Sequence, residues 1–237
     1  QQDFPMNEHT SKKFDAELEG IRTRVLQMGG MVELQIVKAM EGLSDGDLLL
    51  IDQVIENDNR VNHLEIELDE ACNQIIAKRQ PTAVDLRMIS TVQKTITDLE
   101  RIGDEAKKIA KTAKQLHTTG SNFTPQIRLA HIATAVVDML RTSLDAYARL
   151  DTISAAQVVR QDKEVDAEFK GIMRQLITYM MEDPRTISQS IELMFVAKSV
   201  ERIGDHAKNI AEYVVYMVKG RDVRHTSLEE IEREATR

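Results

Sequence analysis

The chain contains two copies of one acidic pair. In each copy the spacing lets both carboxylates act on the same bound group. Glu100 and Asp104 lie four residues apart in the run Glu-Arg-Ile-Gly-Asp, and the same five residues return 101 positions later with Glu201 and Asp205. Four residues make about one helical turn, so the two carboxylates of each pair share a helix face. Carboxylate oxygens are the ligands of hard cations such as Mg²⁺, Ca²⁺, Mn²⁺ and iron. Each copy is therefore a candidate metal site.

Further acids lie on the segment that precedes each copy. Asp162 and Asp166 precede the second copy, and Asp162 falls within about 40° of the apolar face of its predicted helix. A carboxylate so close to a core needs a cationic partner, which an arginine, a lysine or a metal ion can supply. Asp58 is the counterpart of Asp162 in the first half, where Asn62 replaces the second acid. We therefore expect the site of the second half to be the stronger one.

The same acidic pairs also fit an ordinary surface role. On a helical wheel Glu100 and Asp104 lie opposite the apolar side of their helix, which places them at an edge of the fold. There they would form ion pairs with Arg101, Arg202 or neighbouring lysines, without any metal. Lys107 begins a basic row that we interpret as a solvated helix face. Spacing alone does not choose between the two roles.

Other site chemistries find little support in the sequence. The chain contains no Gly-x-x-x-x-Gly-Lys loop for nucleotide phosphates and no Ser/His/Asp or Cys/His arrangement for nucleophilic catalysis. None of its histidines follows a glutamate by three positions, as the Glu-x-x-His signature of di-iron carboxylate bundles requires. Zinc prefers His and Cys, and only His206 lies beside an acidic motif. We predict no catalytic residue and no bound nucleotide.

Composition limits the classes of partner and compartment. A net charge of −8 with no tryptophan is typical of a protein that does not bind nucleic acid. No apolar run approaches the roughly 18 residues of a membrane span, so we expect no direct membrane insertion. Cys72 is the single cysteine, which excludes an intrachain disulfide and favours a reducing, cytoplasmic location. Its helical context predicts a buried, inert thiol.

The elements that position the acids are predicted to be long helices. Apolar residues recur at helical spacing, while glycine, proline and aromatic residues are few. Short connections between the helices make neighbours antiparallel. The predicted helices span about residues 10–42, 47–79, 82–117, 126–150, 154–182 and 185–219.

These helices form a repeat. The run from Asp58 to Asn62 aligns with that from Asp162 to Asp166, so the repeat unit is three helices of about 30 residues, each about 45 Å long. We predict an all-α fold, a tandem repeat of two similar three-helix bundles built from six long antiparallel helices. The first bundle takes residues 8–118, the second residues 124–220, and residues 221–237 form a short C-terminal tail.

Each acidic pair encloses a glycine, Gly103 in the first copy and Gly204 in the second. Glycine inside a helix costs about 1 kcal/mol relative to alanine, so a repeated glycine needs a reason. We expect either the close approach of another helix or room for a ligand beside the acids.

Several motifs in combination resemble the PhoU family, the accessory regulators of bacterial phosphate-specific transport. They are the duplicated Glu-Arg-Ile-Gly-Asp, the run Arg79-Gln80-Pro81-Thr82, and the run Thr178-Tyr179-Met180-Met181-Glu182-Asp183. The resemblance covers roughly residues 9 to 225. It implies a fold of two three-helix bundles, as the periodicity does.

The resemblance also implies a function and partners. Members of the family are cytosolic, non-enzymatic negative regulators of the phosphate-starvation response. They couple a phosphate ABC transporter, through its ATPase subunit, to a phosphate-sensing histidine kinase, and they form homodimers. Some carry clusters of divalent metal or iron (Mg, Mn, Zn or Fe) and others show none. The motif positions that match those clusters are Asp58, Glu100, Asp104, Asp162, Asp166, Glu201 and Asp205. A metal-binding helical protein with redox or storage activity remains the alternative.

Overall fold

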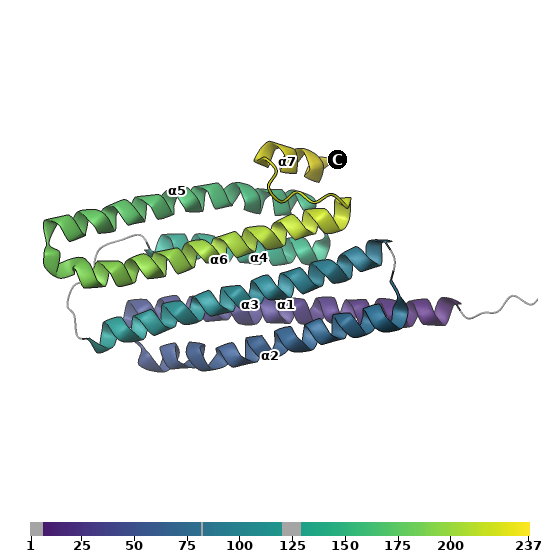
Figure 1. Ribbon diagram of the computed structural model, residues 1–237, viewed down its shortest axis with the longest axis horizontal. Helices are drawn as coiled ribbons and strands as arrows, with labels where there is room; N and C mark the ends of the chain where they lie inside the picture. The colour runs from purple at the N-terminus through teal and green to yellow at the C-terminus, as the bar shows by residue number, and fades with distance from the viewer. Residues whose placement is uncertain (1–6, 82, 120–128) are drawn as a thin grey trace, which may run out of the picture.

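The computed structural model describes residues 7–81, 83–119 and 129–237. Within these residues all regular structure is helical and no strand occurs, so the all-α prediction is confirmed (Figure 1). A 3₁₀ turn, η1, precedes the sixth of seven α-helices. The bounds are α1 Asn7–Asp45, α2 Leu48–Arg79, α3 Ala83–Thr118, α4 Leu129–Arg149, α5 Thr152–Glu182, η1 Pro184–Thr186, α6 Ile187–Lys219 and α7 Leu228–Thr236.

The first six helices form the two predicted three-helix bundles. Helices α1, α2 and α3 pack on one another, and so do α4, α5 and α6. The apolar positions that recur at helical spacing line each core. In α1, for example, Val25, Met28, Val32 and Ile36 are completely buried. Periodicity therefore predicted which helix faces meet.

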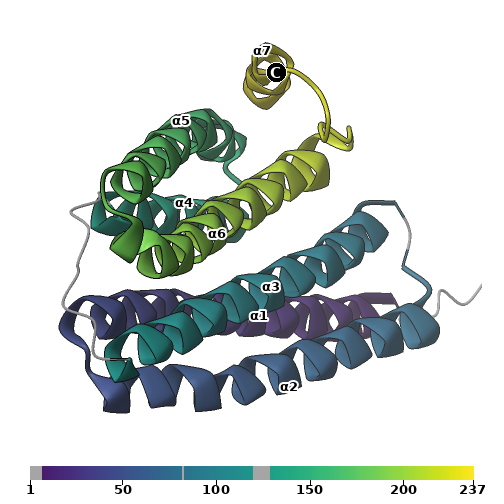
Figure 2. The same ribbon diagram turned by 60° about the vertical axis from the view of Figure 1, so that its left-hand side comes forward.

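The bundles lie side by side, with α3 beside α6 and α1 beside α4 (Figure 2). Polar contacts join them across this interface. His206 Nδ1 lies 2.6 Å from Asp98 Oδ1, and Arg22 Nη2 donates to the carbonyl oxygen of Ala148 at 2.9 Å. The two helices that carry the repeated acidic motif are thus one of the two helix pairs that meet between the bundles.

Helix ends follow the local capping chemistry. Asp47 caps α2, its side chain accepting from the backbone of Leu49 and Leu50, and Asp151 caps α5 slightly before the predicted start. Gly220, with φ +75°, ends α6 as predicted, because glycine adopts this left-handed conformation without strain. Residue 82, where the third helix was predicted to begin, lies outside the described residues. The division at 8–118, 124–220 and 221–237 stays a prediction.

The C-terminal tail packs against the second bundle. Ser227 caps α7 by accepting from the backbone N–H of Glu230. Ile231 is 2% exposed, and Thr152 Oγ1 donates to the carbonyl oxygen of Ala235 at 2.7 Å. Helix α7 therefore covers the N-terminal part of α5.

The two motif glycines allow close helix approach. A Cβ on Gly204 would lie 3.2 Å from a methyl group of Val136 and 3.8 Å from Asp162 Oδ1. A Cβ on Gly103 would lie 3.2 Å from Gln35 Oε1 and 3.7 Å from Asp58 Oδ1. The first expectation for these glycines is confirmed, and the approach also brings a carboxylate beside each.

No helix among the described residues combines the length and apolar character needed to cross a membrane.

Candidate metal centre

Three acids meet between α5 and α6. Asp162 and Asp166 lie one turn apart on α5, and Asp205 projects from the neighbouring α6. One carboxylate oxygen from each residue lies within 4.8 Å of the others, and within the described ranges this is the group of acids that meets that spacing. In the second half, one acid of the repeated motif thus lies beside the two acids of the preceding helix.

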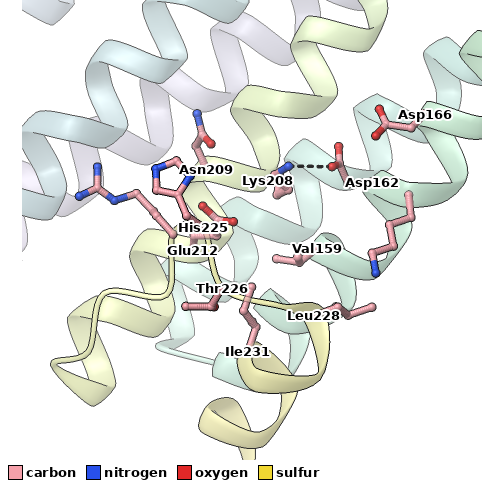
Figure 3. A pocket seen from close by; sticks show the side chains of 12 residues that line it. Val159, Asp162, Asp166, Lys208, Asn209, Glu212, His225, Thr226, Leu228 and Ile231 are labelled. Carbon is pink, nitrogen blue, oxygen red and sulfur yellow. Dashed lines mark hydrogen bonds and ion pairs between the residues drawn. The ribbon is translucent and has the colours of Figure 1, made fainter.

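Asp162 is the buried member of this cluster. It is 4% exposed, and its Oδ2 accepts from Lys208 Nζ at 2.9 Å (Figure 3). Its other oxygen, Oδ1, has no hydrogen-bond partner in the described part of the chain. A buried carboxylate oxygen left unpaired costs free energy, which a bound cation would offset. The donor set and this orphaned oxygen fit a hard divalent cation.

The electrostatics of the cluster point to a deficit of positive charge. Burial raises the pKa of Asp205 to about 6, and repulsion from Glu201 and Asp162 adds to the effect. Burial also raises the pKa of Asp162, against the lowering effect of Lys208. Glu201 accepts from Lys198 Nζ at 2.6 Å, so that lysine is already engaged. A further cation among these acids would reduce their mutual repulsion.

The first half repeats the arrangement with fewer charges. Asp58 is completely buried and accepts from Lys107 Nζ at 2.7 Å, and Asn62 Nδ2 lies 3.4 Å from the same oxygen. Burial, followed by repulsion from Asp104, raises the pKa of Glu100. Asn62 brings an amide where Asp166 brings a carboxylate, so no three-acid group forms among the described residues of this half.

The two lysines were missed by sequence reasoning. The interpretation of Lys107 as part of a solvated face is wrong, because its ammonium pairs with the buried Asp58. Lys208 holds the equivalent position in the second half, and each lysine follows its motif aspartate by three residues. That common spacing is the signal that could have identified both as counter-ions.

Arg202, which was predicted to pair with the motif acids, lies at the interface between the bundles. Arg202 Nη1 lies 3.5 Å from Glu105 Oε1, and His206 and Asn209 both contact Asp98. A hollow of about 460 Å³ lies here, lined by the aspartates of both motif copies. His206 is therefore an interface residue paired with a buried aspartate.

A pocket of about 370 Å³ adjoins the cluster, between α5, α6 and the C-terminal segment (Figure 3). Glu212 lines it and is only 7% exposed, with no hydrogen-bond partner among the described residues. Burial raises the pKa of this carboxyl to about 7, and Lys208 opposes the shift. Glu212 lies on α6 after Asp205, and residues of the C-terminal segment line the pocket with it.

We expect Glu212→Gln to stabilise the protein at pH 8. The folded-state pKa of about 7 exceeds the ordinary value of 4.5, so the folded state binds this proton more tightly. The contribution of Glu212 to stability therefore falls as pH rises from about 4.5 to about 7. Urea unfolding should show a gain of about 2 kcal/mol at pH 8 and almost none at pH 4.5.

Glu164→Gln, at an exposed position of α5, is the control and should show no such pH dependence. An equal effect of Glu212→Gln at both pH values would contradict the assigned burial effect.

The PhoU domain family matches two segments of the chain, residues 25–113 and 129–214, one in each bundle. The chain belongs to the PhoU family. The phosphate-specific transport system accessory protein PhoU of Escherichia coli K12 is 48% identical over 229 residues, covering 96% of this chain and 94% of that protein. The PhoU homolog of Pseudomonas aeruginosa is 47% identical over 229 residues, covering 97% of this chain and 95% of its own length.

Solved PhoU structures share the fold. The crystal structure of PhoU from Pseudomonas aeruginosa superposes with a TM-score of 0.85 at 48% identity, over 88% of this chain and all of that one. The phosphate transport system regulatory protein PhoU from Streptococcus pneumoniae gives 0.83 at 26% identity, over 89% and 99% of the two chains. The predicted fold and family resemblance are both confirmed.

Within this PhoU fold the seven predicted site residues divide into two groups. Asp162, Asp166 and Asp205 come together, with Glu201 near enough to raise the pKa of Asp205. Asp58, Glu100 and Asp104 interact electrostatically without forming a compact ligand set. Metal binding at either group stays a prediction.

Proposed function

We propose that this protein is a cytoplasmic negative regulator of the phosphate-starvation response. It would couple the phosphate-specific ABC transporter to its sensor histidine kinase and modulate phosphate uptake. Two PhoU domains in one chain, and relatives named as accessory proteins of phosphate-specific transport at close to half identity, support this role. Membership of that family is the observation that carries the proposal.

The proposed action is binding rather than catalysis. Its partners would be the ATPase subunit of the transporter and the kinase, and a second copy of the chain would complete a homodimer. The apposed α3 and α6 each carry a copy of the acidic motif, and such partners would bind to the surface that these two helices form.

Deletion of the gene tests the regulatory role. In phosphate-rich medium we expect a reporter of the phosphate-starvation response to be as active in the deletion strain as in starved wild-type cells. Reintroduction of the full chain should return the reporter to its low level. A reporter that stays repressed in the deletion strain would overturn the proposal.

We further propose that the acids bind a divalent metal or iron. Asp162, Asp166 and Asp205 would provide the first ligands, with Glu201 beside them. Asp58, Glu100 and Asp104 would form a weaker counterpart. The orphaned oxygen of Asp162 supports this proposal. An all-oxygen donor set favours Mg²⁺, Mn²⁺ or iron over zinc.

A second candidate function, redox or metal-storage activity, is favoured by the same acidic cluster. Metal analysis combined with a redox turnover assay separates it from the regulatory role. Turnover by the metal-loaded protein that disappears in Glu201→Ala/Asp205→Ala would establish this candidate, and its absence in the loaded wild type would exclude it.

A further inference from the structure

The C-terminal tail covers a carboxyl group to which it gives no hydrogen bond. Glu212 of α6 is 7% exposed and lines the pocket of about 370 Å³ together with residues of the tail (Figure 3). Lys208, one turn before it, already pairs with Asp162. Arg224 of the tail likewise pairs with Asp222. Covering a carboxylate without a hydrogen bond costs free energy, and this cost opposes the docking of the tail.

Few contacts hold the tail in place. Ile231 and Ala235 are the buried side chains of α7, and Thr152 Oγ1 donates to the carbonyl oxygen of Ala235. Arg160 pairs with Glu232, but this arginine is 64% exposed, and ion pairs at exposed positions contribute little. A helix of nine residues is not stable without packing. The tail can therefore leave α5 as one unit while both bundles keep their cores.

The connection between α6 and α7 also opposes docking. His225 has φ +65°, in the left-handed region that residues other than glycine and asparagine rarely adopt. This residue lies between Gly220, where α6 ends, and Ser227, which caps α7. Release of α7 would let the backbone of His225 return to an ordinary conformation.

Charged groups from each element around the pocket act on Glu212. They are Asp162, Lys163 and Asp166 of α5, Lys208 of α6, and Asp222, Arg224 and His225 of the tail. Burial is the largest effect and raises the pKa of Glu212 to about 7, while Lys208 and Arg224 oppose the shift. Release of the tail would return this carboxyl to water, where its pKa would fall towards the ordinary value of 4.5.

The docked form thus binds the proton of Glu212 more tightly than the released form does. Docking is then favoured at low pH, because the protonated carboxyl can be covered at little cost. Its free energy becomes less favourable as pH rises from about 4.5 to about 7, and it levels off above that range.

We propose that the C-terminal tail is a pH-sensitive latch on the second bundle, docked when Glu212 is protonated and released when Glu212 is ionised. Release would uncover Val159 and free Arg160 from Glu232, so that this part of α5 becomes an open surface. The inference goes beyond the proposed regulatory function and does not depend on it.

Thiol labelling of the full chain measures release of the tail. Ala235→Cys places a thiol at a position that is 3% exposed, and Glu230→Cys, on the exposed side of the same helix, gives the rate for an open thiol at each pH. The ratio of the two rates is the released fraction. We expect it to rise by at least about tenfold from pH 5 to pH 8, in a buffer that contains a chelator. Cys72 is completely buried and should stay unlabelled as long as its bundle is folded.

Two variants identify the group that responds to pH. Glu212→Gln should keep the released fraction low at pH 8 and remove its dependence on pH. His225→Asn removes the imidazole while asparagine tolerates the left-handed backbone, so the rise should remain. An equal rise in Glu212→Gln, or loss of the rise in His225→Asn, would overturn the proposal.

Hydrogen exchange of the α7 amides gives the released fraction without a cysteine. In the wild-type chain we expect the same rise between pH 5 and pH 8, after correction for the intrinsic effect of pH on exchange. A released fraction that does not change with pH in the wild-type chain would overturn the proposal, whatever the labelled variants show.

Discussion

Lys208→Ala should lower the free energy of unfolding by about 3 to 5 kcal/mol near neutral pH. The ammonium of Lys208 lies 2.9 Å from Asp162 Oδ2, and Asp162 is 4% exposed with its second oxygen already unpaired. Removing the lysine would leave a buried carboxylate with no cation, the most costly way to disrupt such a pair. Urea unfolding measures the loss.

The equivalent pair in the first half gives a matched comparison. Lys107→Ala would likewise leave the buried Asp58 carboxylate without its lysine. Asn62 would still donate to that carboxylate, so we expect a smaller loss in the free energy of unfolding. The double variant Lys208→Met/Asp162→Asn should recover most of the stability, since no charge then remains buried. A loss below about 1 kcal/mol in Lys208→Ala would show that Asp162 does not depend on its lysine.

Asp205→Asn should weaken Mn²⁺ binding by at least about tenfold, a loss that removal of even an outer-shell partner can produce. Asp205 supplies the α6 ligand of the three-acid cluster, and a neutral amide removes both its charge and one carboxylate oxygen. Isothermal titration of the full chain with Mn²⁺ measures the change. At a hundredfold excess over its dissociation constant, the ion should also stabilise the wild type by about 2.7 kcal/mol.

Asp104→Asn is the control for this experiment. It alters the same position of the motif in the half that has Asn62 in place of an acid, and so we expect a smaller effect on the tighter binding event. Equal losses in the two variants, or no Mn²⁺ binding by the wild type, would contradict the assignment of the stronger site to α5 and α6.

Helical spacing was sufficient to predict the fold. Each helix has one side of recurring apolar residues, as with Val25, Met28 and Val32, and the duplicated motif predicted that three such helices repeat. Helix ends were harder to place. Asp151 and Asp47 are local caps that act through side-chain hydrogen bonds to the backbone, and apolar periodicity does not detect those bonds.

The candidate site was predicted less completely. Wheel geometry placed Asp162 near the core and required a cation there, but it did not choose between Lys208 and a metal ion. The pairing of Lys208 depends on how α5 and α6 align along their lengths, which spacing within one helix does not determine. The burial of Glu212 likewise depends on the C-terminal segment after α6, which packs over this residue. Helical spacing within α6 does not predict that packing.

The place of the two acidic motifs also affects how the molecule can move. One copy lies on α3 and the other on α6, which pack against each other between the bundles. Side-chain pairs such as Asp98 with His206 and Glu105 with Arg202 span that contact, and such pairs can exchange partners as one helix slides past the other. Sliding of this kind would change the separation of the two acidic clusters while each bundle kept its own core. The packing of α3 on α6 would in this way set the distance between the two acidic clusters.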